Sequence, residues 1–426
     1  ETAWIITEEN FMKDYSNIVS YLKLRGSVGK TGSQNLGAYD WRTLMGSATY
    51  NGAAGIVPSS LGNDILQWEE QIQKEVGLDY GFWDDRIRGT LGYYQKKVDN
   101  LLYSDPVPTS SSFSSVYQNI GSLKNRGIEF DVRVDIIKNA QKDLTWNVDF
   151  NIARNRTTLE KLNSSDGYFG GGAYDYFKIE EGGETGRFYG YKDAGRLFMT
   201  NEELVGLKTI DPKTGTLKYY RDDYNYERQG DVYIMDLDGD GQITADGDRT
   251  VIGNANPDFF GGFGSTLYWK GLMLNAVFSY SVGGDRFWDE EKNSSGDMNV
   301  YNTSNRILDS WTVNPGVNAS YPRAMYYGWG SNSIITDRYI HDASYLRMTA
   351  LNLSYRLPKH LYKNSILNAV EFTFQATNLF TWTKYPGMDP QGNFSTTYSA
   401  FYNMGIDYST YPSARTYNFG IKLTLK

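Results

Sequence analysis

The chain has 426 residues and a formal net charge of −8, with 42 Lys and Arg residues against 50 Asp and Glu residues. Its basic residues are scattered rather than clustered, which argues against nucleic-acid binding. The absence of cysteine excludes disulfides, thiolate metal sites and cysteine nucleophiles. With only two histidines, a histidine-based metal cluster or a Ser-His-Asp triad is disfavoured.

Aromatic residues make up 15% of the chain, and 35 of them are tyrosines. Tyr and Trp suit surfaces that are apolar on one side and wet on the other. No run of about 18 apolar residues is present, so the sequence predicts no transmembrane helix. Two classes fit this composition: a soluble β-sandwich, and a membrane-spanning barrel whose strands alternate apolar and polar residues.

Apolar and polar residues alternate with a period of two along several segments. In one of them Ile128, Phe130 and Val132 form an apolar set, while Glu129 and Asp131 lie between them. Most of these runs have a length close to the roughly 9–11 residues that a tilted strand needs to cross a bilayer, whereas strands of soluble proteins have about 5–6. The clearest runs are 22–28, 128–136, 146–152, 272–281, 370–377 and 417–425.

This alternation predicts an all-β chain that forms a transmembrane antiparallel β-barrel, with about a dozen strands in these residues. Long stretches rich in Gly, Tyr, Asn and Ser separate some of the strands, and we expect them to be irregular. Barrels place short turns on the periplasmic side and long loops outside, so these stretches are predicted extracellular loops. The stretches are 36–64, 163–229, 285–337 and 385–413.

The segment DLDGDGQITADGD, residues 236–248, is similar to a calcium-binding loop. Acidic oxygens at its first, third and fifth positions and a backbone carbonyl at its seventh can surround Ca²⁺. The twelfth position should be a bidentate acid but is Gly247, and an acid follows one residue late. We predict a structural calcium site, with an acidic turn that binds no metal as the alternative. The predicted ligands are Asp236, Asp238, Asp240, Gln242 and Asp248.

Aromatic residues also cluster within two of the predicted loops. Tyr326, Tyr327 and Trp329 lie in one, and residues 174–177 lie in the other. Aromatic faces in loops can stack on sugar rings or peptide side chains, so the first cluster is a candidate substrate-binding site. A membrane-interface belt and packing of the loop on itself are the alternatives.

Adjacent acids such as Glu290 and Glu291 could suggest the carboxylate pair of a glycosidase. Nothing in the sequence places two carboxylates across a cleft, so we expect solvated turns at these positions. The sequence predicts no catalytic residue, no enzyme activity and no cofactor other than the calcium ion.

Six segments carry a resemblance to a known family, in the family's own order along the chain. They are SYLKLRGSVGKTGSQNLGAY at 20–39, ILQWEEQIQKEVGLDYGFWDDRIRGTLGYYQKKVDNLL at 65–102, NIGSLKNRGIEFDV at 119–132, DRTVIGNANPDFFGGFGSTLYWKG at 248–271, YIHDASYLRMTALNLSYRLP at 339–358 and ATNLFTWTKYPGMDP at 376–390. They resemble the SusC/RagA family of TonB-dependent outer-membrane transporters. The resemblance implies a barrel of about 22 strands with a plug inside, of which residues 1–426 form the carboxy-terminal portion.

The resemblance also implies a function. It is TonB-dependent import of an oligosaccharide or peptide across the bacterial outer membrane, with a SusD-like surface lipoprotein as the lid. TonB would act through an amino-terminal region that this chain lacks, and the barrel would contact outer-membrane lipid. A soluble β-rich glycan-binding protein and a passive outer-membrane porin remain the alternatives.

Both ends of the chain depart from a complete member of that family. The first ten residues, ETAWIITEEN, lack the basic start and apolar core of a signal peptide, so we expect the export signal, the plug and further strands upstream. Family members commonly end in an aromatic residue, whereas here Leu425 holds the outward register and Lys426 follows. We expect either a native end slightly beyond Lys426 or a variant signal.

Overall fold

A computed structural model gives the fold. It describes residues 1–33, 37–139, 141–162, 168–170, 176–200, 203, 208–210, 217–219, 229–241, 243–296, 302–324, 332, 334–363, 366–392 and 404–425. Within these ranges, no helix combines the length and the apolar character needed to cross a membrane.

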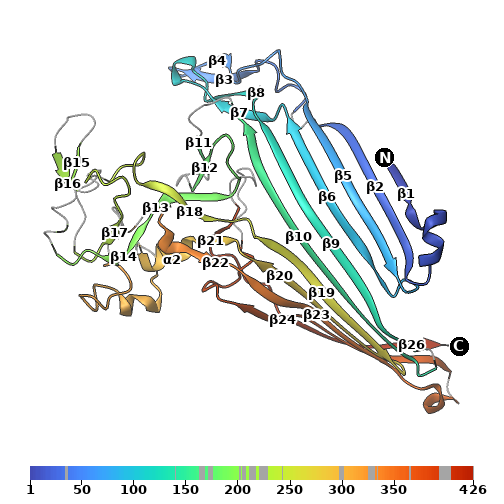
Figure 1. The fold of residues 1–426 in the computed structure, drawn as a ribbon. Helices are drawn as coiled ribbons and strands as arrows, with labels where there is room; N and C mark the ends of the chain where they lie inside the picture. Colours follow the sequence, from blue (N-terminus) through green and yellow to red (C-terminus); the bar gives the residue numbers. More distant parts are fainter. Residues whose placement is uncertain are drawn as a thin grey trace. The chain divides into compact units, whose positions relative to one another are not determined.

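The main element is a sheet of eleven strands in the order β1-β2-β5-β6-β9-β10-β19-β20-β23-β24-β26 (Figure 1). Neighbours in the sheet are successive in the chain once the short strands of the connections are set aside, which is the order of an up-and-down barrel wall. The prediction of about a dozen strands is therefore confirmed. The bounds are β1 Thr2–Ile5, β2 Val19–Ser33, β5 Glu69–Phe82, β6 Ile87–Asp99, β9 Ser122–Asn139, β10 Leu144–Lys161, β19 Phe259–Trp269, β20 Leu272–Val282, β23 Tyr345–Arg356, β24 Leu367–Thr383 and β26 Thr416–Leu425.

The chain divides into two compact units. The first comprises Glu1–Tyr168, Ile179–Thr185 and Gly261–Met273, and the second comprises Phe169–Lys178, Gly186–Phe260 and Leu274–Lys426. Each contains long strands of the sheet.

In the first unit, the strand register sorts the side chains by polarity. Positions paired across β2, β5, β6, β9 and β10 form lateral rows, and successive rows face opposite sides of the sheet. One row is entirely apolar: Leu24, Leu78, Leu91, Phe130 and Ile152. The next row faces the other side and is entirely polar: Lys23, Asp79, Thr90, Asp131 and Asn151. This is the separation expected of a wall between lipid and a wet lumen.

Each alternating run predicted from the sequence lies within one of these strands, and the strands extend beyond the runs. The pattern in 128–136 belongs to β9, where the pairing with β10 shifts between Trp146 and Asn147. This irregularity leaves Ile136 without a register partner, because Trp146 is opposite Ile137 and Asn147 is opposite Asp135. The alternation therefore ends at Asp135, although β9 itself continues to Asn139.

Short turns and long connections alternate along the chain. Lys270 and Gly271 join β19 to β20 with φ angles of 45° and 87°, which two-residue hairpins of type I′ require. In the first unit, β5 joins β6 and β9 joins β10 through short turns, whereas β2 joins β5 and β6 joins β9 through long connections. Since neighbouring strands are antiparallel, these long connections leave one end of the strands, which in barrels is the extracellular end.

The long connections are not irregular throughout, so that expectation is wrong in part. They contain short strands and a hydrophobic core separate from the long strands, because their aromatic residues pack on one another. This core is called the second core. The core residues are Tyr176, Phe177, Phe188, Ala255, Phe287, Ile335, Tyr339 and Ile406. The short elements include β3 Met45–Tyr50, β4 Ala53–Pro58, β7 Leu102–Pro106, β8 Ser115–Asn119, β11 Tyr168–Gly170, β12 Phe177–Ile179, β13 Arg187–Tyr191, β14 Asp193–Leu197, β15 Lys208–Ile210, β16 Leu217–Tyr219, β17 Val232–Ile234, β18 Arg249–Asn254, β21 Asp285–Trp288, α2 Asp289–Glu291, β22 Ile340–Asp342 and β25 Ile406–Asp407.

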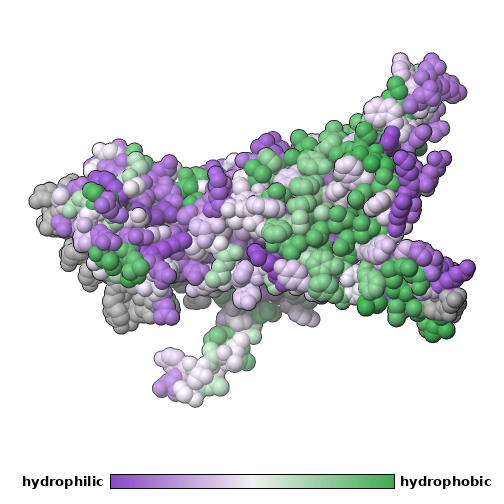
Figure 2. Space-filling view, turned by 90° about the horizontal axis from the view of Figure 1, so that it is seen from below, coloured by the Kyte–Doolittle hydropathy of each residue, from purple (hydrophilic) through white to green (hydrophobic). Residues whose placement is uncertain are grey.

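Hydrophobic residues are concentrated on one part of the molecular surface. Figure 2 shows hydrophobic residues gathered in a broad patch on the face in view, with hydrophilic residues concentrated outside it. Many large apolar side chains of the strands are exposed, among them Val76, Ile128, Phe372 and Phe419. Exposed apolar area of this extent marks a surface that is covered in the working protein, and here lipid is the expected cover.

Candidate functional site

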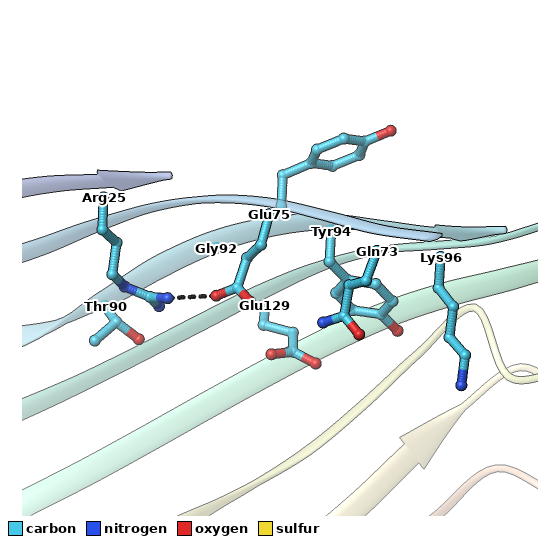
Figure 3. A pocket seen from close by; sticks show the side chains of 9 residues that line it. Arg25, Gln73, Glu75, Thr90, Gly92, Tyr94, Lys96 and Glu129 are labelled. Carbon is cyan, nitrogen blue, oxygen red and sulfur yellow. Dashed lines mark hydrogen bonds and ion pairs between the residues drawn. The ribbon is translucent and has the colours of Figure 1, made fainter. Parts of the chain in front are cut away.

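The polar face of the first unit contains a shallow pocket of about 290 Å³. Figure 3 shows its labelled side chains projecting to the same side of the strands. The guanidinium group of Arg25 on β2 contacts two acidic residues of β5: Arg25 Nη1 donates to Glu75, and Arg25 Nε donates to Asp79 Oδ1 at 3.3 Å. The lining residues are Arg25, Gln73, Glu75, Thr90, Gly92, Tyr93, Tyr94, Lys96 and Glu129.

Two glycines make room for large side chains on this face. A Cβ added at Gly77 would lie 2.6 Å from Arg25 Cζ, and one at Gly127 would lie 2.6 Å from Tyr94 Cε1. The guanidinium and the phenol ring therefore lie flat against the neighbouring strand. The sequence alone gave no indication of these contacts, because each glycine is distant in the chain from the side chain it accommodates.

The charged residues of β9 that alternate with its apolar residues lie on this polar face. Glu129 lines the pocket, and Asp131 accepts from the backbone N–H of Thr90 at 3.1 Å. Asp135 accepts from Arg88 Nη1 at 3.4 Å. A wall of carboxylates, amides, guanidinium and ammonium groups can hydrogen-bond to sugar hydroxyls, to peptide groups or to another protein segment.

The predicted calcium loop brings three of its acids together. One carboxylate oxygen from each of Asp236, Asp238 and Asp240 lies within 4.8 Å of the others. Asp236 accepts from the backbone N–H groups of Gly239 and Gly241, both at 2.8 Å. These hydrogen bonds fold the loop so that its acids converge, and an all-oxygen donor set suits Ca²⁺.

The other two predicted ligands of the calcium ion are Asp248 and Gln242. Asp248 is fully buried and accepts from the backbone N–H groups of Leu237 at 2.7 Å and Thr244 at 2.6 Å, which closes the loop. Gln242 lies outside the described residues. A Cβ at Gly247 would lie 2.2 Å from Asp238 Oδ2, so a side chain at the twelfth position would have to displace the carboxylate of Asp238.

Charge crowding in the loop acts on Asp238. The backbone N–H of Asp240 favours the ionised carboxylate, but desolvation and the nearby carboxylates of Asp240 and Asp248 outweigh it and raise the pKa of Asp238. A bound cation would relieve this repulsion.

Of the two aromatic clusters predicted from the sequence, the structure describes part of only one. Tyr326, Tyr327 and Trp329 lie outside the described residues, so their role in substrate binding stays a prediction. Tyr176 and Phe177, from the other cluster, are 4% and 3% exposed and belong to the second core. Packing of the loop on itself is therefore the correct interpretation for these two residues.

One acidic residue of the connections is not the solvated group that the sequence suggested. Glu291 is 5% exposed. It pairs with Arg306 Nη1 at 2.7 Å and with His341 Nε2 at 2.5 Å, and the guanidinium of Arg306 lies 4.5 Å from the ring centroid of Trp288. The expectation was wrong because the partners that allow burial of this charge are distant in sequence.

A second buried ion pair ties the last long connection to β23. Arg347 Nη2 donates to Asp389 Oδ1 at 2.6 Å, and Arg347 Nη1 donates to Gln391 Oε1 at 2.6 Å. Burial disfavours the charge on Asp389, but hydrogen bonds from Arg347 and from the backbone of Gln391 and Ser413 outweigh it and hold the pKa of Asp389 below its usual value. The pair holds the start of this connection against the first residues of β23.

Long antiparallel strands with one apolar and one polar face, joined by short turns and long structured connections, define the wall of a membrane-spanning β-barrel. The family model described as TonB dependent receptor-like, beta-barrel matches residues 15–379. The chain therefore belongs to the TonB-dependent receptor β-barrel family, whose members are non-enzymatic proteins of the outer membrane. Membership confirms the predicted location and rules out the soluble glycan-binding alternative.

Individual relatives support the SusC/RagA resemblance. TonB-dependent receptor P3 of Formosa agariphila is 32% identical over 99% of this chain and 41% of its own length. TonB-dependent receptor SusC of Bacteroides thetaiotaomicron is 30% identical over 99% of this chain and 39% of its own length. A solved structure of the RagAB peptide transporter aligns with a TM-score of 0.74 at 26% identity, over 99% of this chain and 42% of the solved one. The chain thus spans about two fifths of the relatives it matches.

Proposed function

We propose that the complete protein imports a nutrient across the outer membrane and that TonB supplies the energy. The match of the receptor β-barrel model to residues 15–379 carries this proposal. Residues 1–426 would be the carboxy-terminal portion of the barrel, and a plug and the remaining strands would lie elsewhere in the protein. Among the residues that the structure describes, β1 and β26 each have one edge without a neighbouring strand. This supports the arrangement, because open edges of a sheet are not tolerated in lipid.

The cargo belongs to one of two classes, an oligosaccharide or a peptide. The RagAB structures are those of a peptide transporter, and SusC is the other named relative. The polar inner face fits either class, since its amide, carboxylate and cationic groups can bind sugar hydroxyls or peptide groups. Tyr326, Tyr327 and Trp329 remain the proposed stacking residues for such a cargo.

The proposed partner at the cell surface is a SusD-like lipoprotein that closes over the barrel. The similarity to RagAB supports it. The long connections contain their own hydrophobic core and buried ion pairs. They would therefore form a rigid surface for the lid to contact. TonB would act from the periplasm on the amino-terminal region.

An uptake experiment tests the proposal. A strain that lacks the full gene should lose uptake of labelled oligosaccharides or peptides, and the complete gene should restore it. Deletion of TonB or collapse of the proton gradient should abolish uptake in the complemented strain. Uptake that continues without TonB would contradict active import and favour the passive porin.

We also propose that the loop 236–248 holds a structural calcium ion. The convergence of Asp236, Asp238 and Asp240 supports this proposal. No step of transport depends on the ion, whose role would be to hold the connection between β17 and β18.

A further inference from the structure

A small sheet in the connections of the second unit has one face in the second core and one face that carries charge. Its strands are β21, β22 and β25, and their register pairs Arg286 with His341 and Trp288 with Asp407. Because side chains alternate along a strand, these four residues share one face of the sheet. Phe287, on the opposite face, belongs to the second core. The face that carries Arg286 is called the arginine face below.

The guanidinium group of Arg286 has no carboxylate partner among the residues that the structure describes. Its Nη1 donates to the backbone carbonyl oxygens of Asp285 at 3.0 Å and of Ala255 at 3.4 Å. Nε is buried, and within the described part of the chain neither Nε nor Nη2 has an acceptor. The side chain is therefore held through one nitrogen, and the edge formed by Nε and Nη2 is unused.

Two acids attract the charge of Arg286, but both bind other groups. Asp407 is 2% exposed and accepts from the hydroxyl of Tyr385 at 2.7 Å. Asp285 accepts from the backbone N–H of Asn254 at 2.8 Å. Burial outweighs the attraction of these two acids and lowers the pKa of Arg286. The positive charge at this position is thus only partly compensated.

An uncompensated guanidinium is costly to bury, because arginine keeps its proton in proteins. The Nε and Nη2 edge has the fork geometry that binds both oxygens of a carboxylate through parallel hydrogen bonds. The hydrogen bonds of Nη1 hold the group in position before any ligand arrives. The unused edge of Arg286 is therefore suited to a carboxylate that comes from outside the described residues.

Tyr345, at the start of β23, relates the arginine face to the inner side of the barrel wall. On one side of the β23–β24 hairpin at this end lie Phe380 and Trp382, each 53% exposed. The other side is polar, with Tyr345 opposite Thr383 and Arg347 opposite Thr381. The apolar side faces lipid and the polar side faces the wet lumen. Because Tyr345 also acts electrostatically on the guanidinium group of the arginine face, this face adjoins the lumen side, where a cargo would pass.

We propose that Arg286 binds a carboxylate group of the cargo, so that the complete protein selects acidic oligosaccharides, or peptides with a free carboxylate, over neutral ones. The proposal rests on the import function proposed above and narrows its cargo. A carboxylate from the amino-terminal region of the complete protein is the competing source of the same chemistry, and the experiment distinguishes the two.

Calorimetric titration of the purified full-length protein in detergent tests the proposal with two matched pairs of probes. One pair is acetylated tetra-alanine with a free carboxyl terminus and its carboxyl-terminal amide. The other pair is trigalacturonic acid and its methyl ester. In the wild-type protein at least one acid should bind about tenfold more tightly than its neutral counterpart, since charge-assisted paired hydrogen bonds are strong.

The variant Arg286→Gln should lose this preference and bind the acid and its neutral counterpart about equally. Arg356→Gln, the same substitution at the other end of β23, is the matched control and should keep the preference. The proposal is overturned if neither acid binds more tightly than its neutral counterpart, or if Arg286→Gln retains the preference. Binding in detergent does not require TonB, so failure of active import and loss of carboxylate preference are measured separately.

Urea unfolding without cargo separates the two sources of the carboxylate. Arg286→Gln should leave the midpoint of unfolding unchanged or raise it, because it removes a buried charge that has no ion-pair partner. Arg347→Gln, which breaks the buried pair with Asp389, should lower the midpoint. A loss for Arg286→Gln as large as that for Arg347→Gln would show that a carboxylate of the protein itself already binds Arg286, and the cargo site would be excluded.

Discussion

Phe374 and Thr373 are adjacent in β24 but face different environments. The ring of Phe374 lies 4.9 Å, centroid to centroid, from that of Phe419 on β26, within the outward set. Thr373 pairs with Gly420 on the other face, where a Cβ at Gly420 would lie 2.6 Å from Thr373 Oγ1. Adjacent side chains of this strand thus face opposite sides of the sheet, one toward lipid and the next toward the polar interior.

The change Phe374→Arg should lower the free energy of unfolding by about 2–4 kcal/mol, because a cation on the lipid face near the midplane is costly. Thr373→Arg should cost much less, since the new charge meets the polar face. Urea unfolding of the full-length protein in lipid vesicles measures both. Similar losses for the two variants would contradict the assigned faces.

A glycine opposite an aromatic ring offers a second test at the residue scale. Gly127→Ala should destabilise the protein by about 1–3 kcal/mol, because the added methyl group meets the ring of Tyr94. In a Tyr94→Ala background the same change should cost much less. The double-mutant cycle is measured by the same unfolding assay, and an equal cost in both backgrounds would exclude the ring contact as the cause.

At the scale of elements, the Arg347–Asp389 pair anchors the last long connection to β23. Asp389→Asn should release residues 385–392 and raise their hydrogen exchange, because it leaves a buried guanidinium without its counter-charge, at a cost of about 3–5 kcal/mol. Exchange within β9 should be unchanged and serves as the internal control. Unaltered exchange in the connection would show that other contacts hold it.

The same pair predicts a response to acid. The pKa of Asp389 is lowered from its ordinary value of 3.8, so its contribution to stability is complete above that value and is lost as the pH falls through the lowered pKa. The connection should therefore stay attached at neutral and mildly acidic pH. Hydrogen exchange of 385–392 across a pH series, corrected for the intrinsic rate, measures this, and release near neutral pH would contradict it.

The calcium proposal is tested within one loop. Calorimetric titration should detect one calcium ion bound at the loop, and Asp238→Asn should weaken binding at least tenfold because it removes a charged ligand. Asp246→Asn, in the same loop but outside the three converging acids, is the matched control. Equal binding by both variants, or no binding by the wild type, would show that the loop is an acidic turn.

The strands could be predicted from the sequence, whereas the core of the connections could not. Alternation over many residues is visible in a single segment, as in β9 and β26, because one strand meets lipid on one face and water on the other. The second core joins Phe188, Phe287 and Ile406, which are far apart in the chain. Their strands are too short to show a period, so no local pattern indicated that they are buried.

The acids of the candidate calcium site were recognisable for the same reason as the strands. Asp236, Asp238 and Asp240 follow a local spacing, and a turn of few residues brings them together. The partners of Glu291 and Asp389 come from distant segments, so their burial appeared only in the structure. Local patterns therefore predicted the wall and the loop, and three-dimensional packing determined the ion pairs.

For the whole molecule, the account depends on strands that separate lipid from a wet interior. Successive residues of β9 should then meet different solvents. Because this chain has no cysteine, single cysteines can be placed at Ile128, Phe130 and Val132 and at Glu129 and Asp131, in a full-length protein without other cysteines. Each variant is spin-labelled in lipid vesicles, and collision rates with oxygen and with a water-soluble nickel complex are measured.

Labels at Ile128, Phe130 and Val132 should collide mainly with oxygen, which concentrates in the hydrocarbon. Labels at Glu129 and Asp131 should collide mainly with the nickel complex in the aqueous lumen. A strict alternation between the two reagents is the predicted result. Equal access of the nickel complex to all five positions would contradict the barrel wall and the outer-membrane function built on it.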